Sequence, residues 1–381
     1  MKIEVHLLQN FAPSCLNRDD TGTPKECVFG GVRRARISSQ SYKRALRNHF
    51  KQAVRTRLLI VEIACQLAQN GRSYEQAVEI VAETFKEGGI ERPQVGKGDE
   101  ASEKDTTKIL LFFDEGALSE MVKLFDNSWD ELVKKSSRVR SAVISDLGNT
   151  LQNAVKAPEI ALFGRMIEVK SSTPFGKFQL NREASCQVAH PISTHRVDPE
   201  TDFYSAVDDL NPKGESSAGM LGVIGFNSAC FYRYAVIDWE ALVDNLDGDT
   251  ATARQTVEAF LKAMVEAIPT GKQNSMAAQN PADFGLFVAR SKGQPMSLAN
   301  AFVSPIENQS GLMTASIQGL DEYWGRLLQV YGDEGIARQA FFTSQPEALT
   351  KTLQGENAVS YPRAVQAIMD AVPGAGEGGA A

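Results

Sequence analysis

The chain has 381 residues, of which 40 are Lys or Arg and 47 are Asp or Glu, so that its net charge is −7, and 43% of its residues are hydrophobic. This composition indicates a globular chain of one elaborated domain or two, and it excludes a protein that is basic throughout. No apolar run approaches the length of a membrane span and the N-terminus lacks a signal-peptide layout, so we expect a cytoplasmic protein with no membrane partner.

The first predicted element is a strand. Residues 2–9 alternate apolar with polar side chains, which predicts a strand that is buried on one face only. A loop rich in Asn, Asp, Gly, Thr and Pro is expected from about residue 10 to residue 31.

A basic run comes next. Residues 31–57 hold nine Lys or Arg and no Asp or Glu, which leaves 31 basic against 47 acidic residues elsewhere, or −16, so the run is a local patch on an acidic body. Ser38 or Ser39 can cap a helix with two faces. Spacings of three and four place Gln40, Lys43, Arg47 and Lys51 on one face, and Tyr42, Ala45, Leu46, His49 and Phe50 on the other.

This layout favours a phosphodiester backbone as the ligand. One face of the helix can pack and the other is a cationic stripe, while Gly30–Gly31 offers flexible backbone near helix N-terminal amides that attract phosphate. A merely solubilising basic helix is the alternative, because basic runs are common.

The rest of the chain predicts a helical insertion in a β-rich body. Amphipathic patterns and stop signals predict helices at 58–68, 74–85, 115–126 and 129–155, with a buried strand at 108–114. Strands are expected at 159–166, 185–197, 223–226, 229–237 and 284–290, helices at 239–246, 250–267 and 315–331, and a disordered Gly/Ala-rich tail. This order is compatible with an α+β core of the RRM-like or ferredoxin-like kind.

Residues 198–222 are too long for a tight turn and carry Phe203 and Tyr204, which is typical of a functional or mobile segment. Tyr204 would more often be packed than stacked on a base. For Met166 a core position is the default, and a wedge between bases is the sharper hypothesis.

The evidence for catalysis is weak. Asp19 and Asp20 could hold a divalent cation beside the basic run, or they could orient Arg18 and a turn at Gly22, and Asp208–Asp209 raises the same question. His190 and His195, five residues apart, would point to opposite faces of a strand, which forms neither a metal pair nor a dyad. The five scattered cysteines have no zinc-ligand spacing and no phosphate-loop motif is found, so we expect no metal and no cofactor.

Eight segments resemble the CasC family, the backbone subunits of the type I-E CRISPR Cascade complex of antiviral defence. They keep their order over roughly residues 1–330: Leu16–Asp20, Phe29–Gly31, Arg36–Ser41 with Lys43 and Arg44, Gly164–Met166, Ala189–His195, Ala206–Leu210, Phe231–Tyr234 and Pro295–Phe302.

The resemblance implies an RRM-like palm with a helical finger insertion and a β-hairpin thumb. The palm would comprise 1–57 and 156–370, the fingers 58–155, the thumb 196–226, and 371–381 would be a disordered tail. Copies of such a protein stack head to tail along a CRISPR RNA as a filament and do not cleave it. The implied partners are CRISPR RNA, target DNA, further copies of the chain, the large, small, 5′-handle-binding and 3′-hairpin-binding or processing Cascade subunits, and a recruited helicase-nuclease.

The resemblance also implies roles for individual residues. Phosphates of the guide would be contacted by Arg18, Lys25, Ser38, Gln40, Lys43 and Arg47, and the basic run adds Arg33 and Arg34. Met166 would wedge at the displaced base, and Tyr204 with Ser205 would lie at the thumb tip. We further hypothesise a DNA contact by basic residues that cluster on one predicted finger helix: Lys134, Lys135, Arg138 and Arg140.

Two stretches depart from the family pattern. Residues 303–309 lack the lysines expected there, and the insertion at 170–178 has no counterpart. Two other functions stay open: a metal-dependent ribonuclease on the same scaffold using Asp19 or Asp20, and a self-assembling scaffold that binds no nucleic acid.

Overall fold

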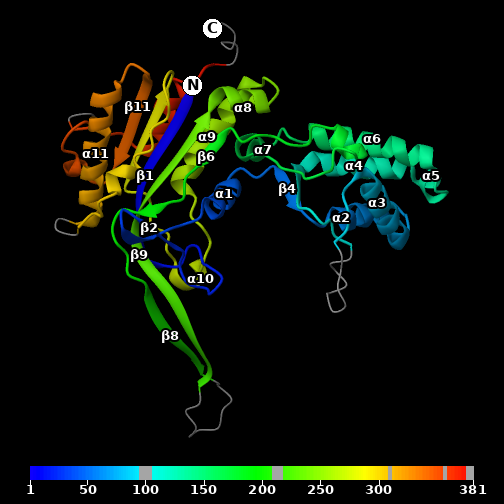
Figure 1. The fold of residues 1–381 in the computed structure, drawn as a ribbon, viewed down its shortest axis with the longest axis horizontal. Helices are drawn as coiled ribbons and strands as arrows, with labels where there is room; N and C mark the ends of the chain where they lie inside the picture. Colours follow the sequence, from blue (N-terminus) through cyan, green and yellow to red (C-terminus); the bar gives the residue numbers. More distant parts are fainter. Residues whose placement is uncertain (94–104, 208–217, 308–310, 355–357, 375–381) are drawn as a thin grey trace. The chain divides into compact units, whose positions relative to one another are not determined.

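The computed structural model describes residues 1–93, 105–207, 218–307, 311–354 and 358–374 (Figure 1). The chain divides into two compact units, the first made of Met1–Phe50, Cys186–Glu240 and Ala253–Ala381, the second of Lys51–Ser185 and Ala241–Thr252. Helices combine with antiparallel sheet, as expected for an α+β protein. None of the described helices is both long and apolar enough to span a membrane.

The first unit is built on an antiparallel sheet with β1 (Lys2–Ser14) at its centre. The strand order is β11 (Ile336–Thr343), β10 (Phe284–Arg290), β1, β9 (Ala218–Asp238) and β6 (Cys186–Val188), and the short β7 (Ile192–Ser193) also pairs with β9. Helix α1 (Ser39–Arg47) follows β1 in the chain and α9 (Thr250–Glu266) follows β9. Because every neighbouring pair is antiparallel, β1 is parallel to β6, with β9 between them, and β9 is parallel to β10, with β1 between them.

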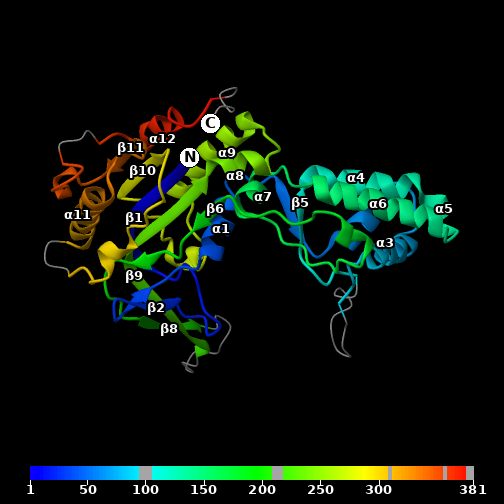
Figure 2. The same cartoon turned by 45° about the horizontal axis from the view of Figure 1, so that its top comes forward.

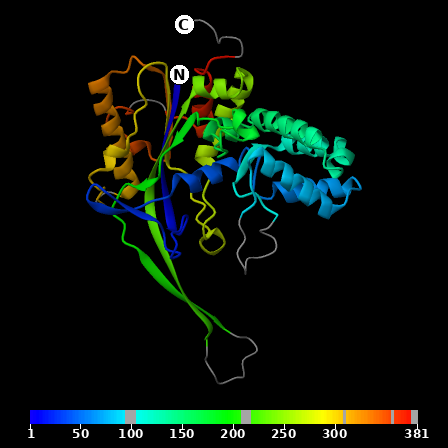
Figure 3. The same ribbon diagram turned by 45° about the vertical axis from the view of Figure 1, so that its right-hand side comes forward.

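The two faces of this sheet are covered by different helices. α11 (Leu312–Tyr331) lies along one face (Figure 3), and its Trp324 belongs to the same buried cluster as Leu8, Tyr232 and Leu286. Arg233 lies on the opposite face, where its guanidinium is 4.1 Å from the ring centroid of Tyr42 in α1 and donates to a carbonyl of α9. The expectation of a strand buried on one face only is wrong for β1, since both faces carry a core layer.

A long hairpin extends from the sheet. β8 (Glu200–Val207) pairs with the first half of β9, from Glu200 opposite Phe226 to Val207 opposite Ala218 (Figure 1). The two strands expected at 223–226 and 229–237 are one strand, because the backbone continues from the hairpin into the sheet beside β1. The connection at 208–217, with Asp208 and Asp209, lies outside the described residues.

A second hairpin occupies the end of the expected loop. β2 (Glu26–Phe29) pairs with β3 (Val32–Ala35), and Phe29 opposite Val32 closes a two-residue turn at Gly30 and Gly31, with φ of 61° and 79°. Both residues have the left-handed conformation of a type I′ turn, which glycine adopts without strain. A Cβ on Gly30 would lie 1.7 Å from the Val303 carbonyl oxygen, so Gly30–Gly31 is a tight turn packed against the backbone of Val303 and not a flexible segment.

The second unit is mainly helical around its own core. Its helices are α2 (Leu59–Gln69), α3 (Tyr74–Gly88), α4 (Glu115–Asn127), α5 (Trp129–Val133), α6 (Ser137–Asn153), α7 (Pro158–Phe163) and α8 (Trp239–Asn245), and β4 (Ala53–Thr56) pairs with β5 (Leu111–Asp114). The helix expected at 129–155 is broken at Lys135, whose φ is 58°. The strand expected at 159–166 is helix α7, which has Pro158 in its first turn, where the fixed φ of proline suits a helix.

This unit is larger than the expected 58–155 because Arg165 and the insertion at 170–178 pack into it. The Arg165 guanidinium donates to the carbonyls of Leu180 (2.7 Å) and Ala154 (3.1 Å). Phe175 is fully buried and lies against Phe85, and Phe178 lies against Gly148 of α6.

The C-terminal part of the first unit contains two elements that the sequence pattern did not predict, β11 and α12 (Tyr361–Met369) (Figure 2). α12 packs against β10 and β11. The expected disordered tail begins in ordered residues, since Val372 is buried and Arg254 donates to the Pro373 carbonyl (3.1 Å). Residues 375–381 lie outside the described part of the chain.

A buried polar network crosses the α11 face of the sheet. The Arg290 Nε donates to Glu4 Oε1 (2.8 Å), and the Tyr232 hydroxyl accepts from the Leu298 amide (2.8 Å) while lying 2.9 Å from His6 Nδ1. Since the Tyr232 oxygen already accepts, its proton can go to Nδ1, which requires a neutral His6. Burial lowers the pKa of His6 to about 3.

We predict that His6 makes the fold sensitive to mild acid. Below about pH 6.5 an unfolded histidine takes up a proton that folded His6 refuses, so stability is lost as the pH falls from there towards the folded pKa. Between about pH 7.5 and pH 5.5, the wild type should lose about 1.4 kcal/mol more unfolding free energy than His6→Leu does. Urea unfolding at both pH values measures this difference, and parallel losses in the two proteins would contradict it.

Candidate nucleic-acid interface

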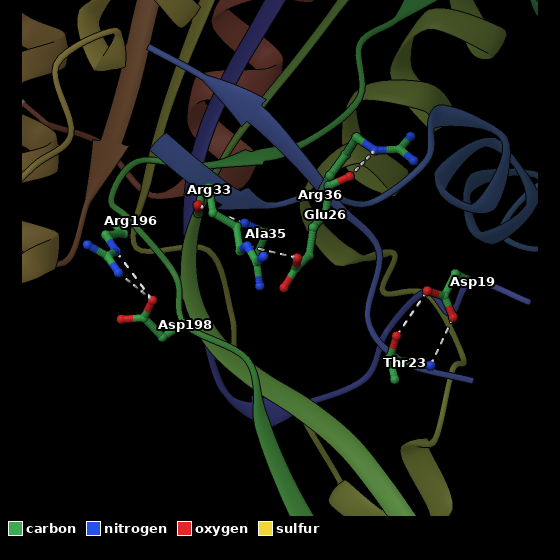
Figure 4. A network of polar contacts seen from close by, with 9 residues as sticks. Asp19, Thr23, Glu26, Arg33, Ala35, Arg36, Arg196 and Asp198 are labelled. Atoms are coloured by element: carbon green, nitrogen blue, oxygen red, sulfur yellow. Dashed lines mark hydrogen bonds and ion pairs between the residues drawn. The ribbon is translucent and has the colours of Figure 1, made fainter. Parts of the chain in front are cut away.

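The first unit contains a groove of about 630 Å³ beside the base of the long hairpin. It is lined by Asp19, Asp20 and residues 23–26 along one loop, by Arg33 and Arg36, and by 199–201 with Gly225. Figure 4 shows Asp19, Glu26, Arg33 and Arg36 among them. One wall carries Lys25, Arg33 and Arg36, and carboxylates lie on the loop and on β8. The groove therefore combines charges of both signs.

Backbone hydrogen bonds fix Lys25 and Arg36 side by side. The Arg36 amide donates to the Lys25 carbonyl (2.9 Å), and the Lys25 amide donates to the Asn17 carbonyl (3.0 Å). The Asn17 side chain accepts from the Ser38 amide (2.8 Å), so the same residue also holds the start of α1. These positions belong to a braced junction and do not depend on one flexible loop.

Asp19 holds its own loop. Its Oδ1 accepts from the amide of Thr21 (2.9 Å) and that of Thr23 (3.0 Å), and its Oδ2 accepts from the Thr23 hydroxyl (2.9 Å). The Thr21 hydroxyl also donates to Oδ1 (2.8 Å). This bond is the largest cause that lowers the pKa of Asp19, and the bonds from Thr23 and from the Thr21 amide add to it. Gly22, with a φ of 86°, completes the turn. Both oxygens of Asp19 are thus engaged in the structural role considered for it.

The described residues contain no group of three or more His, Cys, Asp or Glu that could hold a metal ion.

The basic side chains in and beside the groove differ in whether a carboxylate pairs with them. Arg33 lies 3.4 Å from the Glu26 carboxylate, and Arg196, at the start of the hairpin, lies 3.0 Å from that of Asp198 (Figure 4). Among the described residues no carboxylate lies within ion-pair distance of Lys25 or Arg36. Arg36 was not among the predicted contacts, although its place two residues before the helix cap was a usable signal.

Arg34 does not share this surface. It is fully buried, and its guanidinium donates to the carbonyls of Phe29 (3.2 Å), Ser193 (3.2 Å), Phe302 (2.7 Å) and Val303 (3.3 Å). The prediction of a phosphate contact by Arg34 is wrong in this structure, because every arm of the side chain is turned inward. Arg34 thus supplies the hydrogen-bond donors for carbonyls of three chain segments.

Helix α1 has the expected cap and faces. Ser38 is the N-cap, and its hydroxyl accepts from the Ser41 amide (3.4 Å). Tyr42, Ala45 and Leu46 are buried, while Gln40 and Arg44 are exposed and Lys43 and Arg47 are half-buried. His49, Phe50 and Lys51 lie beyond the helix end, so the two predicted faces are each one turn shorter than expected.

His190 and His195 both make defined hydrogen bonds near the groove. His190 is exposed and its Nδ1 accepts from the Ser39 amide (2.7 Å). His195 is half-buried; its Nε2 accepts from the Cys230 amide (3.2 Å) and its Nδ1 lies 2.7 Å from the Arg196 carbonyl. Because Nε2 accepts from an amide, the proton of the neutral ring lies on Nδ1 and is donated to the Arg196 carbonyl. Burial lowers the pKa of His195.

The hairpin presents aromatic side chains. Phe203 and Tyr204 are 76% and 41% exposed, and Ser205 is exposed as well. The Tyr204 ring lies over Gly222, where a Cβ would be 2.3 Å from it, so the missing side chain makes room for the ring. Phe203 is paired with Val223, which is also exposed.

The remaining predicted residues belong to the second unit. Met166 is 74% exposed, so the default of a core methionine is wrong. Lys134, Lys135 and Arg138 are exposed but do not share one helix, because the break between α5 and α6 separates them. Lys134 lies 3.0 Å from Glu131, and Arg140 is held between Glu83 and Glu87.

Comparisons with known proteins cover nearly the whole chain. The model of the CT1975-like protein family matches residues 3–368. A solved chain from a CRISPR RNA-guided surveillance complex described as pre-nicking is 29% identical, with a TM-score of 0.84, covering 98% of this chain and 100% of that one. A second, from a CRISPR RNA-guided surveillance complex, is 26% identical, with a TM-score of 0.73 and coverage of 97% and 100%. No curated protein matches the sequence.

We predict that neighbouring arginines of β3 differ sharply in their effect on stability. Arg34→Met leaves the buried carbonyls of Ser193 and Phe302 and the part-buried carbonyls of Phe29 and Val303 without this donor, and it should lower the unfolding free energy by about 3 kcal/mol. Arg33→Met, the matched control, removes an exposed ion pair and should change it by less than about 0.5 kcal/mol. Chemical denaturation of the two variants compares them directly, and equal effects would refute the structural role of Arg34.

Proposed function

Since the chain belongs to the CT1975-like protein family, we propose that it is a noncatalytic CRISPR RNA-binding subunit, stacked in multiple copies as the backbone of a type I-E Cascade surveillance complex. In this role it supports pairing of the guide with target DNA. Its partners would be the guide, target DNA, further copies of itself, the other Cascade subunits and a recruited helicase-nuclease. The observation that carries the proposal is the full-length match to chains of CRISPR RNA-guided surveillance complexes.

The charge distribution supports a phosphate-binding role. The chain is acidic overall, yet Lys25 and Arg36 meet in one groove without carboxylate partners among the described residues. Arg18 is exposed on the same loop, and Gln40 is exposed on α1. In an RNA-guided complex base pairing reads the sequence, so the protein binds the backbone and its affinity falls with salt.

The topology supports an RRM-like palm. The order β6-β9-β1-β10, with α1 after β1 and α9 after β9, is the βαββαβ arrangement of a ferredoxin-like fold. In RRMs the open sheet face stacks bases on aromatic side chains of the central strands. Here that face is covered by α11 and buries Tyr232. RNA would therefore bind beside the sheet, at the groove and along α1.

The exposed side chains suit the proposed thumb and wedge. Tyr204 and Ser205 lie on the hairpin that would act as the thumb, and the exposed Met166 is available to lie against a displaced base. Apolar and aromatic contacts separate bases without drawing the strand onto a cation.

We predict that Arg36→Ala weakens the binding of single-stranded RNA and makes the plot of log affinity against log salt shallower by about 0.7, the value for one phosphate contact on a single strand. Lys25→Ala should have the same effect. Arg196→Ala is the matched control, because it removes the same charge from an arginine that Asp198 already pairs. Fluorescence anisotropy over a salt series measures all three, and a slope that changes equally in the control would refute the groove as the binding surface.

We predict that the complex loaded with its guide cleaves neither a matched RNA nor a matched DNA in the presence of Mg²⁺. Asp19, which binds its own loop, is poorly placed to ligate a cation. Co-purification with the other subunits should also yield a bound RNA of uniform length. Cleavage at regular intervals that disappears in Asp20→Ala would instead favour the metal-dependent ribonuclease.

A further inference from the structure

His190 lies on a short segment that is fixed on both sides. It follows β6 and precedes β7, the Ala189 amide donates to the Tyr234 carbonyl (2.9 Å), and the Pro191 carbonyl accepts from the Ile37 amide (3.0 Å). The ring itself is exposed. A side chain held this firmly at the surface has little rotational freedom left to lose on binding a ligand.

The hydrogen bond to Ser39 sets the tautomer of the ring. Nδ1 accepts from a backbone amide, which always donates, so Nδ1 carries no proton and the proton of the neutral ring must lie on Nε2. Among the described residues no protein group is hydrogen-bonded to Nε2. The exposed edge of His190 is therefore a fixed N–H donor.

The surroundings of this donor favour an anion. The charges of Arg36 and Lys25 act on His190 and, after burial, are the causes that lower its pKa. Arg36 is joined to the same segment by a β-bridge to Ile192 and to Lys25 by its own amide. Three segments thus bring two cations and one neutral donor together, and mutual repulsion of the cations would be relieved by a phosphate.

We infer that His190 is a further contact residue of the proposed guide-binding surface, donating through Nε2 to a phosphate oxygen of the RNA beside Lys25 and Arg36. This rests on the proposed function and adds a residue to which neither charge counting nor the family resemblance gave a phosphate contact. The contact is made by a neutral imidazole, so it needs no proton uptake.

Two substitutions separate this contact from a purely structural role. His190→Asn keeps an acceptor near the position of Nδ1 for the Ser39 amide but lacks a donor at the position of Nε2. It should unfold at nearly the wild-type temperature and bind single-stranded RNA about tenfold more weakly, as expected for one lost hydrogen bond to a charged group. His190→Phe lacks both groups and should lose affinity and thermal stability together.

The binding experiment uses the full chain and a fluorescein-labelled single-stranded RNA. His49→Asn is the matched control, since His49 is an exposed histidine that lies 3.9 Å from Glu266 and lines a different hollow, formed with residues of α9. Equal affinity of wild type and His190→Asn would overturn this inference alone. Failure of the wild type itself to bind RNA would overturn the proposed function.

The pH dependence tests the neutral donor. The ratio of the dissociation constants of His190→Asn and wild type should be the same at about pH 7.5 and about pH 6. A ratio that grows at the lower pH would mean that a protonated ring makes the contact, against the tautomer set by Ser39. Nitrogen NMR of the histidine rings in the free protein should find the His190 proton on Nε2.

Discussion

The buried guanidinium of Arg34 is the interaction on which the groove depends. It supplies donors to carbonyls at Phe29, Ser193 and Phe302–Val303, three segments that are far apart in the chain. Buried carbonyls without donors are costly, so Arg34 stabilises the packing of these segments, together with the Ala35 amide, which donates to Ser193 Oγ (3.1 Å), and the Ile306 amide, which donates to the Thr194 carbonyl (3.0 Å). Gly30 meets the same Val303 carbonyl through its backbone. Arg33, the residue before Arg34, is exposed, and Arg36, two residues after Arg34, is half-buried at the groove.

Local features of the site could be predicted from the sequence and tertiary ones could not. The Ser38 cap and the buried face of α1 follow from residue spacing within one helix. Which of Arg33, Arg34 and Arg36 is buried depends on partners more than 150 residues away, and no local pattern contains them. The Gly30–Gly31 turn carried a readable hairpin signal, and Pro158 signalled a helix start. The first was interpreted as flexible backbone, and the residues after Pro158 were predicted to form a strand.

The same distinction between local and tertiary features explains which elements of the fold could be predicted. Long amphipathic helices such as α3 and α9 were predicted with good bounds, since their periodicity is strong. The prediction for β1 was wrong because an alternation of apolar and polar residues predicts one solvent-exposed face. Its polar residues Glu4 and His6 are instead buried and paired with Arg290 and Tyr232. The proposed RRM-like palm carries the same lesson for function. A shared topology does not preserve a binding face when another helix, here α11, covers it.

β9 runs from the hairpin into the middle of the sheet as one strand, so the two regions share one alternation of side chains. Inserting or deleting a single residue near Asn227 would turn Phe203–Val223 and Tyr204–Gly222 to the opposite sides while the sheet stays in register. In the course of evolution the length of this stretch can therefore change only in steps of two residues, or together with a compensating bulge. The spacing between core and hairpin is as much a constraint on divergence as the identity of any side chain on it.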